Sequence, residues 1–311
     1  MIRYSPISMR SIVTGVVLAN ASIDISLHDT YYIINQNNYF AVQEILPCIN
    51  YYYKNFMINN YNNFRYYHPF FVGLLEGDGT ITVDKTSNVT LRVRIVISLK
   101  NTKENYNMLN ILITYIGGRL IIERNNRYVT WIASNKTDLA KVFAILAEYP
   151  LLTSKKICQL NYANKCLLLN NNKDILNNWQ ELKINKYITQ HNLIENFNNK
   201  FILPIYYSAW LSGFIEAKGH FKLYKYPNGN IKTSQFIIGQ NFENYILKSI
   251  LKYFNKENCK IAEIKTKVNN INYYKIGIGG KDFRLSLKNH FELYPLLGNK
   301  HTQYIEWINI N

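Results

Sequence analysis

Two stretches of the chain follow the same order of predicted elements, which is helix, strand, strand, helix, strand, strand, helix. The first stretch covers residues 66–169 and the second covers residues 201–311, with a polar, Asn-rich linker at residues 170–200. Each stretch carries the same motif before its last helix, Tyr-Pro-Leu-Leu-x-x-Lys, at Tyr149–Lys155 and Tyr294–Lys300. Because pattern, order and motif agree, the sequence predicts an α+β protein with pseudo-two-fold symmetry and two αββαββα halves.

The charge of the chain favours a polyanionic partner. Residues 1–65 carry four basic and three acidic side chains, so they account for +1 of the formal net charge of +16, and residues 66–311 carry the other +15. A basic field of this size attracts nucleic acid, although a basic but otherwise ordinary surface is the alternative. The four cysteines form no CxxC pair, so neither a zinc site nor a disulfide framework is expected.

The N-terminal region differs from the repeated core. The stretch TGVVLANASIDISLHDTYYI at Thr14–Ile33 resembles cytochrome c oxidase subunit 1. This resemblance implies a reading frame that continues from an upstream exon, with residues 1–34 as an exon-like leader and residues 35–65 as a connector. An import signal within residues 1–23 is the alternative. Asn, Ile, Tyr and Lys are abundant and have A/T-rich codons, which favours a mitochondrial origin. No apolar run reaches the roughly 18–20 residues of a membrane span, so no stable span is expected.

The two predicted helices that open the halves share a spacing of small residues. Gly73 and Gly77 are four residues apart, as are Gly213 and Ala217. Residues four apart lie on one face of a helix, and small side chains there let two backbones approach closely. Each glycine also costs helix stability, by about 1 kcal/mol. We therefore expect these two helices to pack directly against each other.

The segments FVGLLEGDG at Phe71–Gly79 and LSGFIEAKG at Leu211–Gly219 resemble the motif helices of LAGLIDADG homing endonucleases and of the related intron RNA maturases. The similarity extends over roughly residues 66–311 and includes both closing motifs. It implies a monomer in which two four-stranded antiparallel sheets form a saddle over a duplex. It also implies metal-dependent, site-specific cleavage of DNA, with an acid after each motif helix holding Mg²⁺.

The two halves differ at this acidic position. Asp78 matches the first acid of the family, and we expect it to be a metal ligand if the protein is catalytic. Lys218 occupies the position of the second acid. A protonated lysine has three donors and no acceptor, so it does not ligate Mg²⁺. We expect Lys218 to lie near Asp78, to pair with it or with a phosphate, and to weaken metal binding.

Four further residues have counterparts in the family. Lys155 and Lys300 match basic residues that the family places near its active centre. Two solvated lysines at helix starts are the alternative. Glu76 and Glu216 precede the acidic positions by two residues, and the resemblance implies that they are chiefly structural.

The predicted strands supply a nucleic-acid-binding surface. After Asp78, the polar positions Thr80 and Thr82 share a face because strand side chains alternate. The matching face of the second half carries His220, Lys222 and Tyr224. Further candidates are the basic residues Arg92, Arg94, Arg119, Arg127, Lys232, Lys265 and Lys275. A two-stranded ribbon fits the major groove of DNA, whereas RNA would be bound mainly through shape and phosphate contacts.

Three functions remain open at this point. The first is an intron-encoded, Mg²⁺-dependent DNA endonuclease that acts at an exon junction, and the family favours it. The second is an RNA maturase that binds its own intron and assists splicing. The third is a DNA-binding protein without catalysis. Lys218 favours the second reading, or an enzyme that nicks or cuts poorly.

Overall fold

The computed structural model describes residues 63–86, 90–168, 179–265 and 272–309. The first half contains a helix over residues 63–78, β1 (Gly79–Lys85), β2 (Leu91–Lys100), α4 (Lys103–Ile116), β3 (Arg119–Glu123), β4 (Tyr128–Ala133), α5 (Lys136–Glu148) and α6 (Ser154–Leu168). The second contains α10 (Tyr207–Lys218), β5 (His220–Lys225), β6 (Ile231–Asn241), α11 (Asn244–Tyr253), β7 (Ala262–Lys265), β8 (Asn272–Ile278), α12 (Lys281–Leu293) and α13 (Asn299–Ile308). The order of elements is therefore the same in both halves, as the sequence repeat predicts.

The two sheets have the same topology. Their strand orders are β1-β2-β4-β3 and β5-β6-β8-β7, and all neighbouring strands are antiparallel. In β1 the buried side chains Ile81 and Val83 alternate with the more exposed Thr80 and Thr82. The buried face of each sheet packs on helices, with α6 against β1 and β2 and α13 against β5. The opposite face, which carries Thr80 and Thr82 in β1, is the more exposed one.

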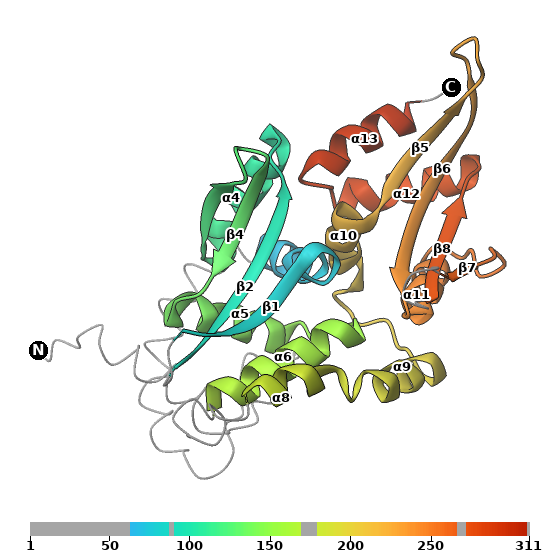
Figure 1. Ribbon diagram of the computed structural model, residues 1–311. Helices are drawn as coiled ribbons and strands as arrows, with labels where there is room; N and C mark the ends of the chain where they lie inside the picture. Colours follow the sequence, from blue (N-terminus) through green and yellow to red (C-terminus); the bar gives the residue numbers. More distant parts are fainter. Residues whose placement is uncertain (1–62, 87–89, 169–178, 266–271, 310–311) are drawn as a thin grey trace, which may run out of the picture.

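The helix over residues 63–78 and α10, hereafter the motif helices, lie between the two sheets (Figure 1). A Cβ added to Gly73 would lie 1.9 Å from the Trp210 carbonyl oxygen, and one added to Gly213 would lie 1.9 Å from the Phe70 carbonyl oxygen. The two backbones are thus in van der Waals contact. Gly73 contacts Trp210 and Gly77 contacts Ala217, so the residue numbers at the contacts increase in the same direction along both helices. The helices therefore run parallel, and their C-terminal ends meet. The close packing expected from the small-residue spacing is confirmed.

Two tyrosines brace the halves against each other. Tyr66, in the first motif helix, donates to the carbonyl oxygen of Pro295 in the second half. Tyr206, immediately before α10, donates to the carbonyl oxygen of Pro150 in the first half. Both prolines belong to the closing motifs, so each motif helix holds the turn that precedes the last helix of the opposite half.

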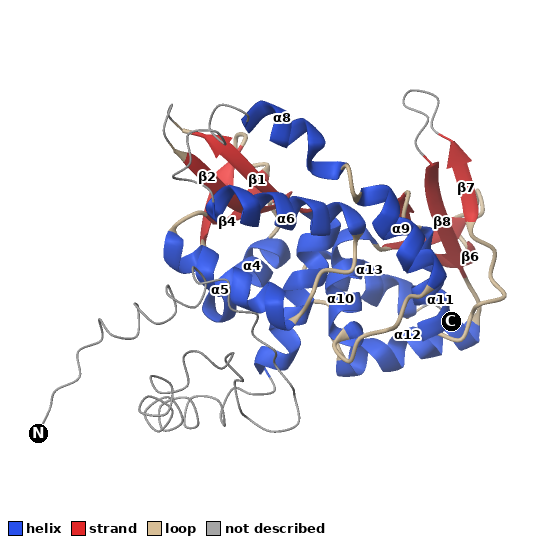
Figure 2. Cartoon of the chain, turned by 90° about the horizontal axis from the view of Figure 1, so that it is seen from below, coloured by secondary structure: helices blue, strands red, loops and turns tan. Residues whose placement is uncertain are grey.

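The segment between the halves is more structured than a polar linker. Within residues 170–200 the structure contains α8 (Trp179–Ile184), a 3₁₀ turn at Asn185–Tyr187 and α9 (Gln190–Asn199). Helix α9 contacts both α6 of the first half and α11 of the second, and Figure 2 shows it between these two helices. It therefore spans the junction of the two halves.

The N-terminal boundary differs slightly from the expected one. The first motif helix begins at residue 63, so the last residues assigned to the connector are helical. The proposed leader and the rest of the connector lie outside the described residues. No helix in the described part of the chain has both the length and the apolar character needed to cross a bilayer.

Candidate active site and nucleic-acid interface

The C-terminal ends of the motif helices place Asp78 beside Lys218, and we call this junction the seam. Lys218 Nζ donates to Asp78 Oδ1 over 3.0 Å. The two side chains are 34% and 30% exposed for Lys218 and Asp78, so solvent reaches both of them. A positive charge is favourable at a helix C-terminus and a negative charge is not. The ion pair therefore relieves the unfavourable placement of the Asp78 carboxylate.

The motif glutamates hold the helices that follow the closing motifs. Glu76 Oε1 accepts from the backbone N–H groups of Leu152 and Thr153, at 2.7 and 2.5 Å. Glu216 accepts from the backbone N–H groups of Leu297, Gly298 and Lys300, at 3.2, 3.1 and 2.9 Å. Both carboxylates thus bind N–H groups at the start of a helix, where donors are otherwise unpaired. The structure gives both glutamates structural contacts, as the resemblance implies.

Each of these helix starts is also bound from the opposite half. Glu243, just before α11, accepts from Ser154 Oγ at 2.5 Å and from the backbone N–H of Lys155 at 3.2 Å. Asn105 Oδ1, in α4, accepts from the backbone N–H of Asn299 at 2.9 Å. The first turns of α6 and α13 are therefore fixed by both halves. This arrangement brings Lys300 within electrostatic reach of Asp78 at the seam.

The lysines at these turns have different surroundings. Lys155 is exposed, whereas Lys156 is buried at 6% exposure, and burial lowers the pKa of Lys156 to about 8. Burial also lowers the pKa of Lys300, while the nearby carboxylates of Glu216 and Asp78 act to raise it. Sequence reasoning missed Lys156 because the closing motif aligns Lys155 with Lys300.

Nine of the predicted binding residues share the polar faces of the two sheets. On the first sheet Thr82 pairs with Arg94, and on the second Lys222 pairs with Gln235. Partners in an antiparallel pair project to the same face. By this register and by strand alternation, the polar faces carry Thr80, Thr82, Arg92, Arg94 and Arg119 on one sheet and His220, Lys222, Tyr224 and Lys275 on the other.

The polar face of the second sheet reaches the seam. His220 begins β5 directly after Gly219, and Lys300, Lys222 and Lys275 all lower the pKa of His220, after burial as the main cause. A basic surface therefore continues from the second sheet to the seam. On the first sheet, Arg94 is paired with Asp84 at 2.5 Å, which fixes that guanidinium above the strands.

Three predicted residues are placed differently. Lys265 pairs with Asn272, so it projects to the face opposite Lys275, whose partner is Ala262. Arg127 lies in the turn between β3 and β4, where its Nε donates to the Arg124 carbonyl oxygen. Lys265 therefore does not share a face with Lys275, because strand side chains alternate and the sequence alone did not fix the register of β7 on β8.

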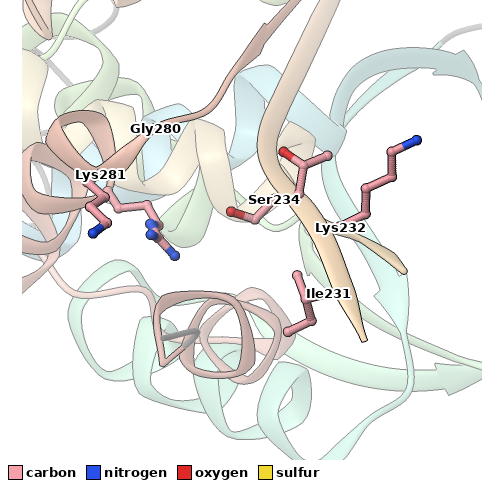
Figure 3. Close-up of a pocket in the computed structure, with 7 residues that line it drawn as sticks. Ile231, Lys232, Ser234, Gly280 and Lys281 are labelled. Carbon is pink, nitrogen blue, oxygen red and sulfur yellow. The ribbon is translucent and has the colours of Figure 1, made fainter. Parts of the chain in front are cut away.

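A β-bulge determines the direction of Lys232. The register of β5 and β6 shifts between Tyr224 and Lys225, which leaves Lys232 as an extra residue. Figure 3 shows Lys232 pointing away from Lys281, across the strand that borders a pocket of about 260 Å³ between β6 and the start of α12. The Lys232 ammonium lies 5.8 Å from the centroid of the Tyr226 ring. A bulge commonly redirects a side chain in this way.

The chain matches the family model described as LAGLIDADG endonuclease over residues 71–166 and 211–311. The chain belongs to the LAGLIDADG endonuclease family. The two matched regions coincide with the two repeated halves and begin within the two motif helices.

Relatives agree with this assignment. A protein of Dictyostelium citrinum named "Probable intron-encoded endonuclease aI3" is 33% identical, over 77% of this chain and 93% of its own length. A protein of Debaryomyces hansenii with the same name is 30% identical, over 95% of this chain. This chain spans only 48% of the Debaryomyces hansenii protein.

Solved structures show the same fold. The LAGLIDADG meganuclease I-CpaMI bound to uncleaved DNA matches with a TM-score of 0.58 at 18% identity, over 77% of this chain and 89% of that one. I-SmaMI, bound to an uncleaved DNA target in the presence of calcium ions, matches with a TM-score of 0.54 at 18% identity, over 77% and 88%. The predicted α+β, pseudo-two-fold LAGLIDADG fold is confirmed.

The donor set at the seam of this LAGLIDADG protein does not fit a divalent ion held between two carboxylates. Asp78 supplies one carboxylate, and its Oδ1 is occupied by the Lys218 ammonium. In the described part of the chain, no three His, Cys, Asp or Glu side chains are grouped so that they could hold a metal ion. Mg²⁺ requires hard oxygen ligands, and the ammonium supplies none.

Proposed function

We propose that this LAGLIDADG protein is intron-encoded, binds a specific duplex DNA site at an exon junction, and cleaves it poorly in the presence of Mg²⁺. The ion pair between Lys218 Nζ and Asp78 Oδ1, at 3.0 Å, carries this proposal. Lys218 puts a cation where the second acid is expected, and its ammonium binds Oδ1 of the first acid, Asp78. The basic faces of both sheets support DNA binding independently of cleavage.

The names of the relatives support the intron-encoded part of the proposal, since both relatives above are named intron-encoded endonucleases. Both relatives come from organisms that have mitochondria. The composition of this chain is also typical of A/T-rich coding, so we propose that the protein is mitochondrial. Its coding sequence should then hybridise to purified mitochondrial DNA. Hybridisation to nuclear DNA alone would contradict this placement.

We also propose that the protein is a monomer, because one chain supplies both motif helices. Light scattering measures the molar mass in solution and tests this.

The test of the cleavage proposal uses a supercoiled plasmid that carries the intronless exon junction, with Mg²⁺. Linear product reports a double-strand break, and relaxed circular product reports a nick. The natural chain should bind the plasmid site and yield little linear product. Lys218→Glu should raise the rate of linear product by about tenfold or more, which corresponds to about 1.4 kcal/mol of barrier.

Lys218→Gln is the matched control, because it removes the ammonium without adding an acid. It should release Asp78 from the ion pair and leave double-strand cutting low. Efficient linear product from the natural chain would contradict the proposal. An unchanged rate in Lys218→Glu would show that the seam is not what limits cleavage.

An RNA maturase is the second candidate, and the same ion pair favours it. A seam closed by an ion pair leaves the basic faces available to RNA phosphates without a cleavage reaction. A maturase should bind its intron RNA more tightly than an unrelated structured RNA of equal length, at moderate salt, and should accelerate splicing. Equal affinity for the two RNAs would exclude this function.

A further inference from the structure

Strand β1 lies at an edge of the first sheet, since the strand order is β1-β2-β4-β3. In an antiparallel edge strand, every second N–H group points away from the neighbouring strand and finds no acceptor there. The N–H group of Ile81 donates instead to Oε1 of Gln159 in α6, over 3.2 Å. Ile81 and Gln159 are 3% and 4% exposed, so a buried N–H group depends on this acceptor.

The segment between the halves holds the other end of the same amide. Gln159 Nε2 donates to the hydroxyl of Tyr187 over 2.9 Å. Because Oε1 accepts from the Ile81 N–H group, the two partners together define the orientation of the Gln159 amide. Nearby, Gln190 Nε2 donates to Ser154 Oγ over 3.1 Å, so a second contact fixes this part of the segment to α6. The amide of Gln159 therefore connects the segment between the halves to the middle of β1.

Strand β1 is the strand that carries the polar face towards the seam. Thr80 and Thr82 flank Ile81 and lie on the more exposed face, and Asp78 immediately precedes the strand. Residues on a sheet edge have a neighbouring strand on one side only, so their position depends on whatever holds the other side. The contact at Ile81 is therefore placed where it can determine how Thr80 and Thr82 meet a duplex.

The second half uses a different contact at the equivalent place. Alignment of the motif glycines makes Phe221 the equivalent of Ile81, and alignment of the closing motifs makes Tyr304 the equivalent of Gln159. The rings of Phe221 and Tyr304 pack with their centroids 5.6 Å apart. Strand β5 is thus held to α13 by direct apolar packing, whereas β1 is also held by a polar bridge that reaches the segment between the halves.

We infer that Gln159 is a positioning residue for DNA recognition, through which Tyr187 sets the position of the edge strand β1. This inference rests on the proposed DNA binding for one of its two tests. Loss of either hydrogen bond should let β1 move at its edge, so that Thr80 and Thr82 meet the DNA less precisely. The second sheet lacks this bridge, so its contacts with DNA should not change.

The first test uses no DNA and measures amide hydrogen exchange in the folded protein by NMR. Gln159→Met should accelerate exchange at Ile81 by about tenfold or more, and Tyr187→Phe should accelerate it by about threefold, because one hydrogen bond is lost in each case. Exchange at Thr82, whose N–H group points towards β2, should change little. In the Gln159→Met chain, Tyr187→Phe should have no further effect at Ile81.

Tyr106→Phe is the matched control, because it removes a hydroxyl from a residue of α4 that is 40% exposed. It should leave exchange at Ile81 unchanged. Equal acceleration at Ile81 and Thr82 in Tyr187→Phe would indicate general destabilisation and would overturn the inference, as would unchanged exchange at Ile81.

The second test measures affinity for exon-junction duplexes that each carry one substituted base pair. Thr82→Ala and Lys222→Ala identify the half-sites of the first and second sheets. Tyr187→Phe should reduce discrimination between base pairs by about threefold in the half-site of the first sheet and leave the other half-site unchanged. Tyr106→Phe should change neither. An equal loss in both half-sites would contradict a role through β1.

The two tests separate the possible failures. If the natural chain does not discriminate among the duplexes, the proposed function fails, and hydrogen exchange alone decides on Gln159. If Gln159→Met does not fold, Tyr187→Phe decides, because it leaves the acceptor for Ile81 in place. Unchanged exchange at Ile81 in that variant then refutes the inference.

Discussion

Lys218 ends α10 with a charge that the helix dipole favours, and Asp78 ends the equivalent helix with a charge that the dipole disfavours. Their pairing stabilises the protein without any metal. A second acid at position 218 would instead bring two carboxylates together at two helix ends. At the scale of single residues, the natural seam is therefore suited to a stable metal-free protein more than to metal binding.

The position of Lys218 beside Asp78 could be predicted from sequence, because close packing of two helices with matching glycines brings equivalent positions together. The burial of Lys156 could not. It depends on the phase of α6, which Glu76 and Glu243 fix through contacts distant in sequence. A motif alignment compares positions along the chain and contains no information on which side of a helix is covered.

His290 provides a prediction on acid stability. It is buried, bonds to Ser212 Oγ at 3.0 Å and to the Tyr253 hydroxyl at 3.0 Å, and burial lowers its pKa from 6.5 to about 3. Between those values the unfolded chain binds the proton and the folded chain does not. This contribution to stability is therefore present above pH 6.5 and is lost as the pH falls towards 3.

The free energy of unfolding should fall by about 2 to 3 kcal/mol more in the natural chain than in His290→Gln between pH 7 and pH 4.5. Urea unfolding at the two pH values measures this difference. His191, whose side chain is 80% exposed, provides the matched control variant, His191→Gln. Equal losses in the natural chain and His290→Gln would show that His290 is not the group responsible.

At the scale of elements, the motif helices determine how the halves are joined. Their spacing of small residues was sufficient to predict the contact. The helices of the segment between the halves were not predicted, because that segment is rich in Asn and polar residues that favour helices weakly. Contacts of α9 with α6 and α11 supply the stabilisation that local propensity lacks.

Gly73→Ala tests the close helix contact. The added methyl group would lie 1.9 Å from the Trp210 carbonyl oxygen and 2.8 Å from the Phe214 backbone nitrogen, so one of the two helix backbones must shift. We expect a loss of about 3 kcal/mol or more in the free energy of unfolding. Gly277→Ala is the control, because the nearest atom to its added Cβ is 3.5 Å away, on Gln235. Equal stability of the two variants in thermal unfolding would contradict the contact.

At the scale of the whole molecule, the sequence repeat predicted the fold and most of the polar faces. Strand alternation placed Thr80 with Thr82 and His220 with Lys222 correctly. It did not place Lys265 or Lys232. The face of Lys265 depends on the register of β7 on β8, and the direction of Lys232 depends on the position of a bulge. A local pattern of polar residues encodes neither of them.

Lys275 and Lys265 test the assignment of the binding face, because they lie on adjacent strands and opposite faces. Lys275→Ala should weaken DNA binding and reduce the slope of log affinity against log salt by about 1, since one phosphate contact is lost. Lys265→Ala should leave both quantities nearly unchanged. Fluorescence anisotropy with labelled duplex DNA at several salt concentrations measures them. Equal slopes for the two variants would show that DNA does not lie on the predicted face.

The ion pair at the seam also has a genetic consequence. A lysine codon becomes a glutamate codon by a change of its first base, so Lys218 is one point mutation from an acid. If the acid restores cutting as proposed, a lineage that carries this gene can lose and regain the ability to invade intronless alleles through one reversible base change. Selection on the host would then act on that base, while the binding surface remains the same.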